Sequence, residues 1–196
     1  MRVPQAVGAL VPLPVEADSS LLTLSDLLGT GHHGAVTAGA RPGTEQIVFM
    51  DRHTDRTDLG RPFGATDVVA ERGEEGAARV HDLTGGDSVA EVIEAVGTRL
   101  TLETALAAVD DGGTISRLGV PQCDEGPVGQ SMIMRNVTLT GGASPARAYI
   151  DGLLPDVLDG TIHPRSRLRP GRHPRSRPGR LAGDDRPSRP KALITL

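Results

Sequence analysis

The sequence predicts an α/β fold in which parallel strands alternate with helices. Short apolar segments rich in Val and Ile are separated by segments with helical patterns, and glycine-containing turns divide them. The length of 196 residues is sufficient for one domain with a hydrophobic core. Because the chain has only two Phe, one Tyr and no Trp, that core must consist mainly of Val, Leu, Ile and Ala.

Prolines, glycines and capping residues mark where each element is expected to begin and end. Residues 1–18 are predicted to be extended, because prolines recur through an apolar segment. A short helix is expected from Ser19 or Ser20 to Leu28, and Thr30 is expected to cap a second helix from Gly31 to Ala38. The later strands are predicted at Glu45–Met50, Val68–Ala70, Ala90–Val96, Thr114–Val120 and Val137–Thr140. The later helices are predicted at Thr54–Phe63, at Glu74–Leu83, at Leu102–Val109 with Thr101 as cap, and from Pro145 to about Leu158 with Ser144 as cap.

This alternation is typical of a Rossmann-type parallel sheet, whose nucleotide ligands bind beside the loops that follow the strands. One element of such a sheet is missing. A first strand and a G-x-G-x-x-G turn at a helix start normally cradle the pyrophosphate of the cofactor. Gly29, Gly31 and Gly34 have this spacing, but no strand of β-branched residues precedes them, so we do not assign them to phosphate binding. The sequence therefore offers no turn that we assign to the phosphate.

Composition limits the function classes. Cys123 is the single cysteine, which excludes an intrachain disulfide and a cysteine-based zinc cluster. No apolar run is long enough to span a membrane and no signal-peptide pattern is present, so a cytoplasmic location without membrane attachment is expected. The net charge of −4 is unevenly distributed: residues 1–163 have 11 Arg against 23 Asp and Glu (−12), and residues 164–196 have 9 Arg and one Lys against 2 Asp (+8).

Several segments carry a family resemblance. The segment Leu24–Val36, LSDLLGTGHHGAV, resembles the hinge segment of the zinc-dependent medium-chain alcohol dehydrogenases. Other segments resemble that family in its own order: RVPQA and LVPLP near the N-terminus, EVIEAVGT at 91–98, ISRLGVP at 115–121, RNVTLTGG at 135–142 and LLPDVLDGTIHP at 153–164. Each motif is modest alone, and their order over residues 2–164 carries the assignment. The resemblance implies a truncated and internally deleted family member. Its Rossmann-type parallel sheet would be incomplete, without the first strand and the phosphate turn.

The resemblance also implies a domain organisation. Residues 1–28 would be a remnant of the catalytic domain and hinge, and residues 29–163 an incomplete dinucleotide-binding domain. Residues 164–190 would be a disordered tail rich in Arg and Pro, and residues 191–196 a possible terminal strand.

The resemblance also implies a chemistry. In this family, zinc acts as a Lewis acid while hydride is transferred between a small alcohol or aldehyde and NAD(P). By resemblance, Asp26 would bind zinc, Thr30 would face the nicotinamide, and Asp51 and Arg52 would meet the adenosine ribose. The remaining cofactor-lining residues implied are Val96, Gly97, Thr98, Leu118, Gly119 and Val120. NAD is favoured over NADP, because Asp51 would repel a 2′-phosphate. No residue is assigned to catalysis, and the family often forms homo-oligomers.

The residues leave alternatives open. A catalytic zinc needs three protein ligands, and neither Cys nor His precedes Asp26, so Asp26 is alternatively a solvated or capping residue. Asp51 is alternatively the charged cap of a loop. Because the phosphate turn is missing and neighbouring strands would be uncovered, we expect this chain to be inactive and of low stability.

The arginine-rich segment 164–190 has two interpretations. It could be a disordered segment that binds polyanions, and the lack of aromatic residues for base stacking means that such binding would be unspecific. Alternatively it is a frame-shifted stretch of a GC-rich gene, because Arg, Pro, Gly and Ser are what such a gene yields in the wrong frame. The segment Lys191–Leu196, which resembles the final strand of the family, favours the frame shift.

Overall fold

The structure is a computed structural model that describes residues 10–14, 19–123 and 129–164. The predicted tail beyond Pro164 and the predicted terminal strand at 191–196 lie outside these residues, as does most of the extended N-terminal segment. The described residues form two compact units, the first from residues 10–29 and 145–164 and the second from residues 30–144.

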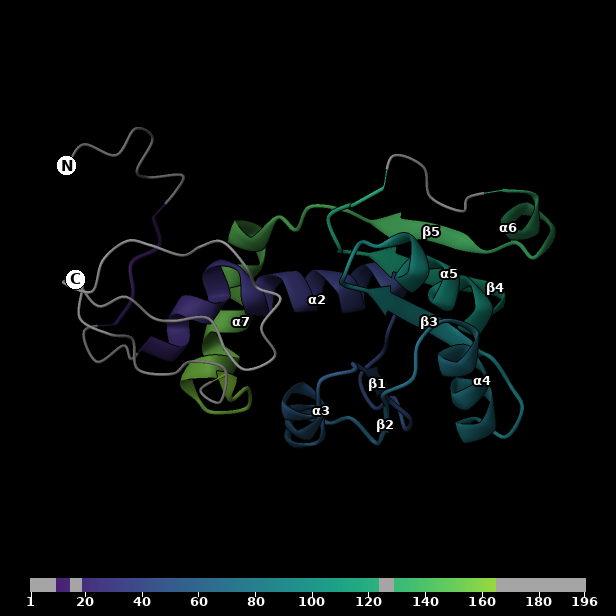
Figure 1. The fold of residues 1–196 in the computed structure, drawn as a ribbon. Helices are drawn as coiled ribbons and strands as arrows, with labels where there is room; N and C mark the ends of the chain where they lie inside the picture. Colours follow the sequence, from purple (N-terminus) through teal and green to yellow (C-terminus); the bar gives the residue numbers. More distant parts are fainter. Residues whose placement is uncertain (1–9, 15–18, 124–128, 165–196) are drawn as a thin grey trace, which may run out of the picture. The chain divides into compact units, whose positions relative to one another are not determined.

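The first unit packs two helical segments against each other. The 3₁₀ helix η1 (Ser19–Ser25) and helix α7 (Ala146–Leu158) share a core, whose buried members are Leu21, Leu24, Ile150 and Leu153. The sequence segment 153–164, which carries part of the family resemblance, therefore folds together with the LSDLL segment and not with the strands. Figure 1 shows η1 and α7 with the start of α2 (Leu27–Ala38).

Three predictions about the helix starts are wrong, those that name Thr30, Thr101 and Ser144 as caps. The helix α7 begins at Ala146, with Pro145 at the cap position and no side-chain cap. The helix expected to reach Leu28 ends as η1 at Ser25, and the chain makes a turn at Asp26 before α2 begins at Leu27. Thr30 therefore lies inside α2 and does not cap it. Thr98 likewise replaces Thr101 as the cap of α5 (Arg99–Ala108), because its side chain accepts the Thr101 N–H.

The second unit alternates strands and helices, as predicted. Before α5, its elements are β1 (Val48–Met50), α3 (Thr54–Gly60), η2 (Arg61–Phe63), β2 (Asp67–Val69), α4 (Gly73–Leu83) and β3 (Val89–Glu94). After α5 come β4 (Val109–Arg117), α6 (Gln130–Met134) and β5 (Thr138–Gly141). The short helix α6 was not predicted, because five residues are too few to show a helical period.

The strands form two separate parallel sheets. One has the order β1-β2 and the other the order β3-β4-β5. The doubly wound dinucleotide fold has the strand order 3-2-1-4-5-6. If β1 and β2 are its second and third strands, and β3 to β5 its fourth to sixth, the observed order is that of the complete fold without strand 1. The predicted incomplete Rossmann-type sheet is thus confirmed, and the interruption falls where strand 1 would pair with both β1 and β3.

Helices cover the sheets from specific sides. On one face of the larger sheet, α5 contributes Leu102 and Ala105 to a core with Val109 and Ile115 of β4. Residues Thr30–Ala38 of α2 lie on the other face, where the Thr37 hydroxyl is 2.7 Å from that of the fully buried Ser116.

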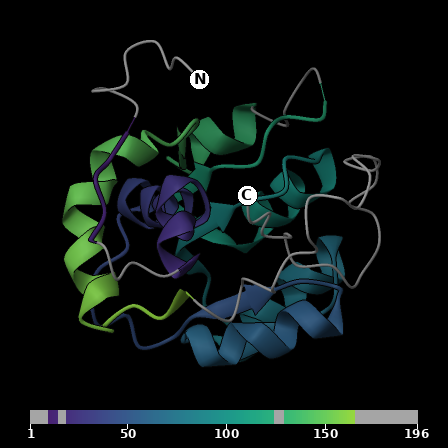
Figure 2. The same ribbon diagram turned by 90° about the vertical axis from the view of Figure 1, so that its left-hand side faces the viewer.

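The smaller sheet packs on α4. Val69, Ala77 and Val80 are buried together there with Ala108 of α5. Figures 1 and 2 both show α4 beside the β1-β2 pair. Within the described part of the chain, no helix combines the length and the apolar character needed to cross a membrane.

Candidate functional site

Two loops cross at the carboxyl ends of β3 and β4. The turn Val96–Thr98 leaves β3 and the segment Leu118–Val120 leaves β4, so the structure brings these six predicted residues together. The backbone N–H groups of Leu118 and Gly119 donate to the Glu94 carbonyl at 2.7 and 3.0 Å. The Gln122 N–H donates to the Gly97 carbonyl at 2.9 Å, and the Gln122 side chain donates to the Val96 carbonyl at 3.0 Å.

Glycine is required on both sides of this crossing. Gly97 has a φ of +90°, and a Cβ there would overlap the Val120 carbonyl. A Cβ at Gly119 would overlap the backbone nitrogen of Gly97. The two loops therefore meet backbone to backbone, which only residues without a side chain allow.

A buried carboxylate organises the crossing from below. The Glu94 side chain is 2% exposed, and its Oε1 accepts hydrogen bonds from the N–H of Val96 (2.8 Å), the N–H of Gly97 (2.7 Å) and the hydroxyl of Thr101 (2.9 Å). The Nε of Arg117 lies 3.6 Å from Oε2, an ion pair too long for a hydrogen bond, and Nη2 of Arg117 donates to the Gly97 carbonyl at 3.4 Å.

The sequence prediction did not single out Glu94 and Arg117 as site residues. The Arg117 side chain is only 16% exposed because Glu94 lies beside it. A signal was available: Glu94 and Arg117 carry opposite charges inside two consecutive predicted strands. In the structure they end β3 and β4 and are partners in the parallel register.

Asp51 and Arg52 follow β1, at the carboxyl end of the smaller sheet. The Asp51 carboxylate is partly buried and caps its own loop, since Oδ1 accepts the His53 N–H at 2.9 Å. Its Oδ2 lies 3.5 Å from Nη1 of Arg56. Arg52 is exposed and its Nε donates to the ring of His53 at 3.1 Å. An acid at this strand end has the location that suits a ribose hydroxyl, and one of its oxygens already serves the loop.

Asp26 and Thr30 belong to α2 and the turn before it. Asp26 is exposed in the turn, where its N–H donates to the Thr23 carbonyl at 3.3 Å. Thr30 is half-buried in the helix. Across the described ranges, no group of three His, Cys, Asp or Glu side chains is arranged to hold a metal ion. The residues present therefore do not fit a catalytic zinc, which takes three protein ligands.

The glycines with G-x-G-x-x-G spacing lie inside α2. A Cβ on Gly34 would be 2.5 Å from Cδ1 of Leu118 and 3.0 Å from Cγ2 of Ile93, so Gly34 lets the helix approach the sheet. A Cβ on Gly31 would meet nothing within 4 Å. A phosphate turn needs free N–H groups at a helix start, and the interior of a helix does not offer them.

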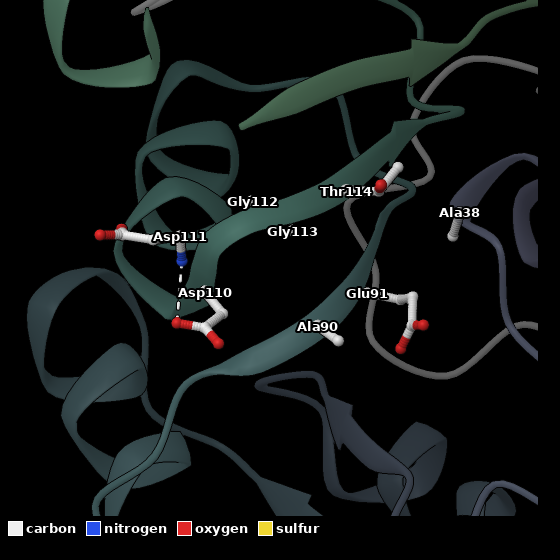
Figure 3. A pocket seen from close by; sticks show the side chains of 8 residues that line it. All are labelled: Ala38, Ala90, Glu91, Asp110, Asp111, Gly112, Gly113 and Thr114. Atoms are coloured by element: carbon white, nitrogen blue, oxygen red, sulfur yellow. Dashed lines mark hydrogen bonds between the residues drawn. The ribbon is translucent and has the colours of Figure 1, made fainter. Parts of the chain in front are cut away.

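A separate pocket of about 220 Å³ lies at the opposite, amino end of β3 and β4. Figure 3 shows its lining, which comes from the end of α2, from Ala90 and Glu91, and from residues 110–114. Three carboxylates line it, those of Glu91, Asp110 and Asp111, and among the described residues they do not form a group arranged to hold a metal ion. Asp111 pairs with Arg135 at 2.6 Å. This pocket is at the wrong end of the strands to receive a dinucleotide.

Comparisons with known proteins agree with one another. The family model described as zinc-binding dehydrogenase matches residues 29–158. An alcohol dehydrogenase of Cupriavidus necator is 34% identical in an alignment of 146 positions that covers 62% of this chain and 40% of that protein. The chain thus spans less than half the length of this curated relative.

Solved structures share the fold. An alcohol dehydrogenase from Thermus sp. ATN1 has a TM-score of 0.65 at 23% identity and covers 82% of this chain and 54% of its own. A zinc-dependent alcohol dehydrogenase from Streptococcus pneumonia has a TM-score of 0.73 at 22% identity, over 88% of this chain and 56% of its own. At these identities the likeness concerns the fold.

Proposed function

Because the chain belongs to the zinc-binding dehydrogenase family, we propose that it derives from the cofactor-binding part of an alcohol dehydrogenase and that, as this chain, it does not catalyse hydride transfer. The observation that carries the proposal is the interruption between the β1-β2 and β3-β4-β5 sheets. In the complete fold, strand 1 and the turn after it hold the pyrophosphate of the dinucleotide. A chain without that strand loses the central anchor of the cofactor.

The surviving residues suit the two ends of a dinucleotide but not the pyrophosphate between them. Asp51 suits the hydroxyl groups of the adenosine ribose and would repel a 2′-phosphate, which supports NAD over NADP. The turn Val96–Thr98 and the segment Leu118–Val120 support a location for the nicotinamide end. Between these two ends the described residues supply no helix N-terminus behind a glycine-rich turn. Hydrogen bonds to a charged group contribute about 1.5–3 kcal/mol each, so losing two of them weakens binding by roughly 10²–10⁴-fold.

Zinc has no fitting ligand set in the described residues. When bound in the family, it supplies Lewis-acid polarisation of the substrate oxygen. Asp26 is the residue that the resemblance assigns to it, and Asp26 is exposed and without a group of co-ligands among those residues. The proposal therefore routes no chemical step through Asp26, and the small alcohol or aldehyde substrate of the family is not assigned a site.

The test measures turnover and zinc retention together. The purified chain is loaded with zinc and dialysed, its zinc content is measured, and alcohol-dependent reduction of NAD is followed with several small alcohols. We expect no turnover and no retained zinc. Turnover that scales with enzyme concentration and disappears in Asp26→Asn would overturn the proposal.

The charge of residues 164–196 supports a second candidate function, unspecific binding of polyanions. These residues carry 9 Arg and one Lys against 2 Asp. Binding through them would weaken steeply with salt, because it rests on released counterions. A DNA titration at two salt concentrations, with the full chain and with residues 164–190 deleted, tests it. Binding that is insensitive to the deletion would exclude this candidate.

A further inference from the structure

We infer that Glu94 is a positioning residue whose carboxylate occupies, from inside the protein, an anion-binding nest at the start of α5, and so fixes the turn Val96–Thr98. That this turn once contacted a cofactor rests on the proposed function. The nest itself is a property of this chain, and nothing in the family assignment names it.

The nest consists of donors that converge on one oxygen. Oε1 of Glu94 accepts from two consecutive backbone N–H groups, those of Val96 and Gly97, and from the Thr101 hydroxyl. Consecutive N–H groups in a turn form a concave site that binds anions, and the N-terminus of a ten-residue helix adds favourable potential. External phosphate or carboxylate groups would normally be the ligands of such a site.

The second carboxylate oxygen of Glu94 shows that burying this carboxylate costs free energy. Oε2 of Glu94 is buried and has no hydrogen-bond partner, and the facing Nε of Arg117 also has none. A buried carboxylate is tolerated only when charge and hydrogen bonds compensate it. Here Arg117 compensates the charge from 3.6 Å and the nest supplies the hydrogen bonds.

The consequence is a turn shaped without help from a ligand. Val96 is 49% exposed, yet its N–H points inward to Glu94. Because Gly97 must meet Val120 and Gly119 backbone to backbone, a change in the turn would also move Leu118–Val120. Glu94 thus sets the geometry of both segments at once, although its side chain is only 2% exposed.

Amide hydrogen exchange of the full chain tests this role directly. In the unaltered chain, the exchange of the Val96 and Gly97 amides should be slow. In Glu94→Gln, which keeps the size of the side chain, and in Glu94→Ala these two amides should exchange at least about tenfold faster. The matched control is Glu91→Ala, an exposed acid on the same strand, which should leave both amides unchanged.

Chemical rescue separates a nest from general loosening. Sodium formate, compared with sodium chloride at equal ionic strength, should restore slow exchange of the Val96 and Gly97 amides in Glu94→Ala and do nothing in Glu91→Ala. If Glu94→Ala does not fold, the exchange of the unaltered chain and of Glu94→Gln decides. Fast exchange at Val96 and Gly97 in the unaltered chain, unchanged exchange in Glu94→Gln, or no response to formate in a folded Glu94→Ala overturns the inference. These readouts need no cofactor, so their outcome is independent of the proposed function, which zinc-dependent turnover or tight NADH binding by the unaltered chain would overturn.

Discussion

The Arg117 guanidinium lies 3.6 Å from the Glu94 carboxylate. The two residues are register partners, and each ends one of two adjacent parallel strands. Both side chains are mostly buried, at 16% and 2% exposure. The pair therefore joins the end of β3 to the end of β4 under the two loops that the family resemblance assigns to the cofactor.

Breaking this pair from the Arg117 side should be costly. Arg117→Met leaves the Glu94 charge buried without its partner, and we expect the free energy of unfolding to fall by about 3–5 kcal/mol. Urea denaturation measures it. The control is Arg147→Met, which removes an exposed pair with Asp151 on α7 and should cost less than about 1 kcal/mol. Equal losses in the two variants would contradict the account.

Gly31 and Gly34 should respond to alanine with opposite signs. Gly31→Ala meets open space inside α2, so it should stabilise the chain by about 0.5–1 kcal/mol. Gly34→Ala pushes a Cβ against Leu118 and Ile93, and overpacking of about 1–3 kcal/mol should exceed the helical gain. Thermal unfolding compares the two variants. Destabilisation by both would argue against a packing role that is specific to Gly34.

The smaller sheet should show an acid-sensitive contribution to stability. The Thr66 hydroxyl and the Gln46 side-chain amide donate to Asp67 and hold the pKa of its carboxyl below the usual range. A lowered folded pKa contributes stability that is complete above the unfolded pKa, about 3.9, and is lost as the pH falls through the folded value.

Asp67→Asn isolates this contribution. The variant should melt below the unaltered chain at pH 6, and the difference in melting temperature should shrink on acidification below about pH 4. A difference that stays constant or grows between pH 6 and pH 3 would contradict the role given to Asp67.

The open edge of β1 should promote association between chains. Ile47, directly before β1, is 45% exposed, and among the described strands β1 pairs only with β2. Ile47→Lys places a charge at this edge and should lower light scattering on concentration. Leu158→Lys, which changes a comparably exposed apolar residue on α7, is the control and should have a smaller effect. If Leu158→Lys is the more effective, edge pairing is not the cause.

The fold could be predicted largely because glycines mark the ends of the elements. Gly39 ends α2, and the pair Gly85-Gly86 follows α4, all three with positive φ. The alternation of strands and helices between them then implied the parallel sheet. The interruption of that sheet was also predictable. The family resemblance fixes the order of the strands, and the sequence lacks the strand and the phosphate turn expected first in that order.

The candidate site was less accessible to sequence reasoning, for a physical reason. The Glu94–Arg117 pair connects residues that are distant in sequence, and local periodicity carries no information about such contacts. The sequence prediction assigned the cap of α5 to Thr101 and not to Thr98. Both threonines suit a cap by residue type, so the local sequence does not decide between them. The choice depends on the Glu94 carboxylate, which takes the Thr101 hydroxyl and leaves Thr98 to accept the Thr101 N–H.

The central claim is that the missing strand, and not the surviving loops, limits cofactor binding. Its most direct measurement is an NADH titration of the unaltered chain beside a variant in which a strand, a G-x-G-x-x-G turn and a helix are inserted between Gly43 and Thr44. We predict binding at least about 100-fold tighter in the variant, because the pyrophosphate regains its N–H donors and the two sheets become one. Equal affinities, in a variant shown to be folded, would contradict the account.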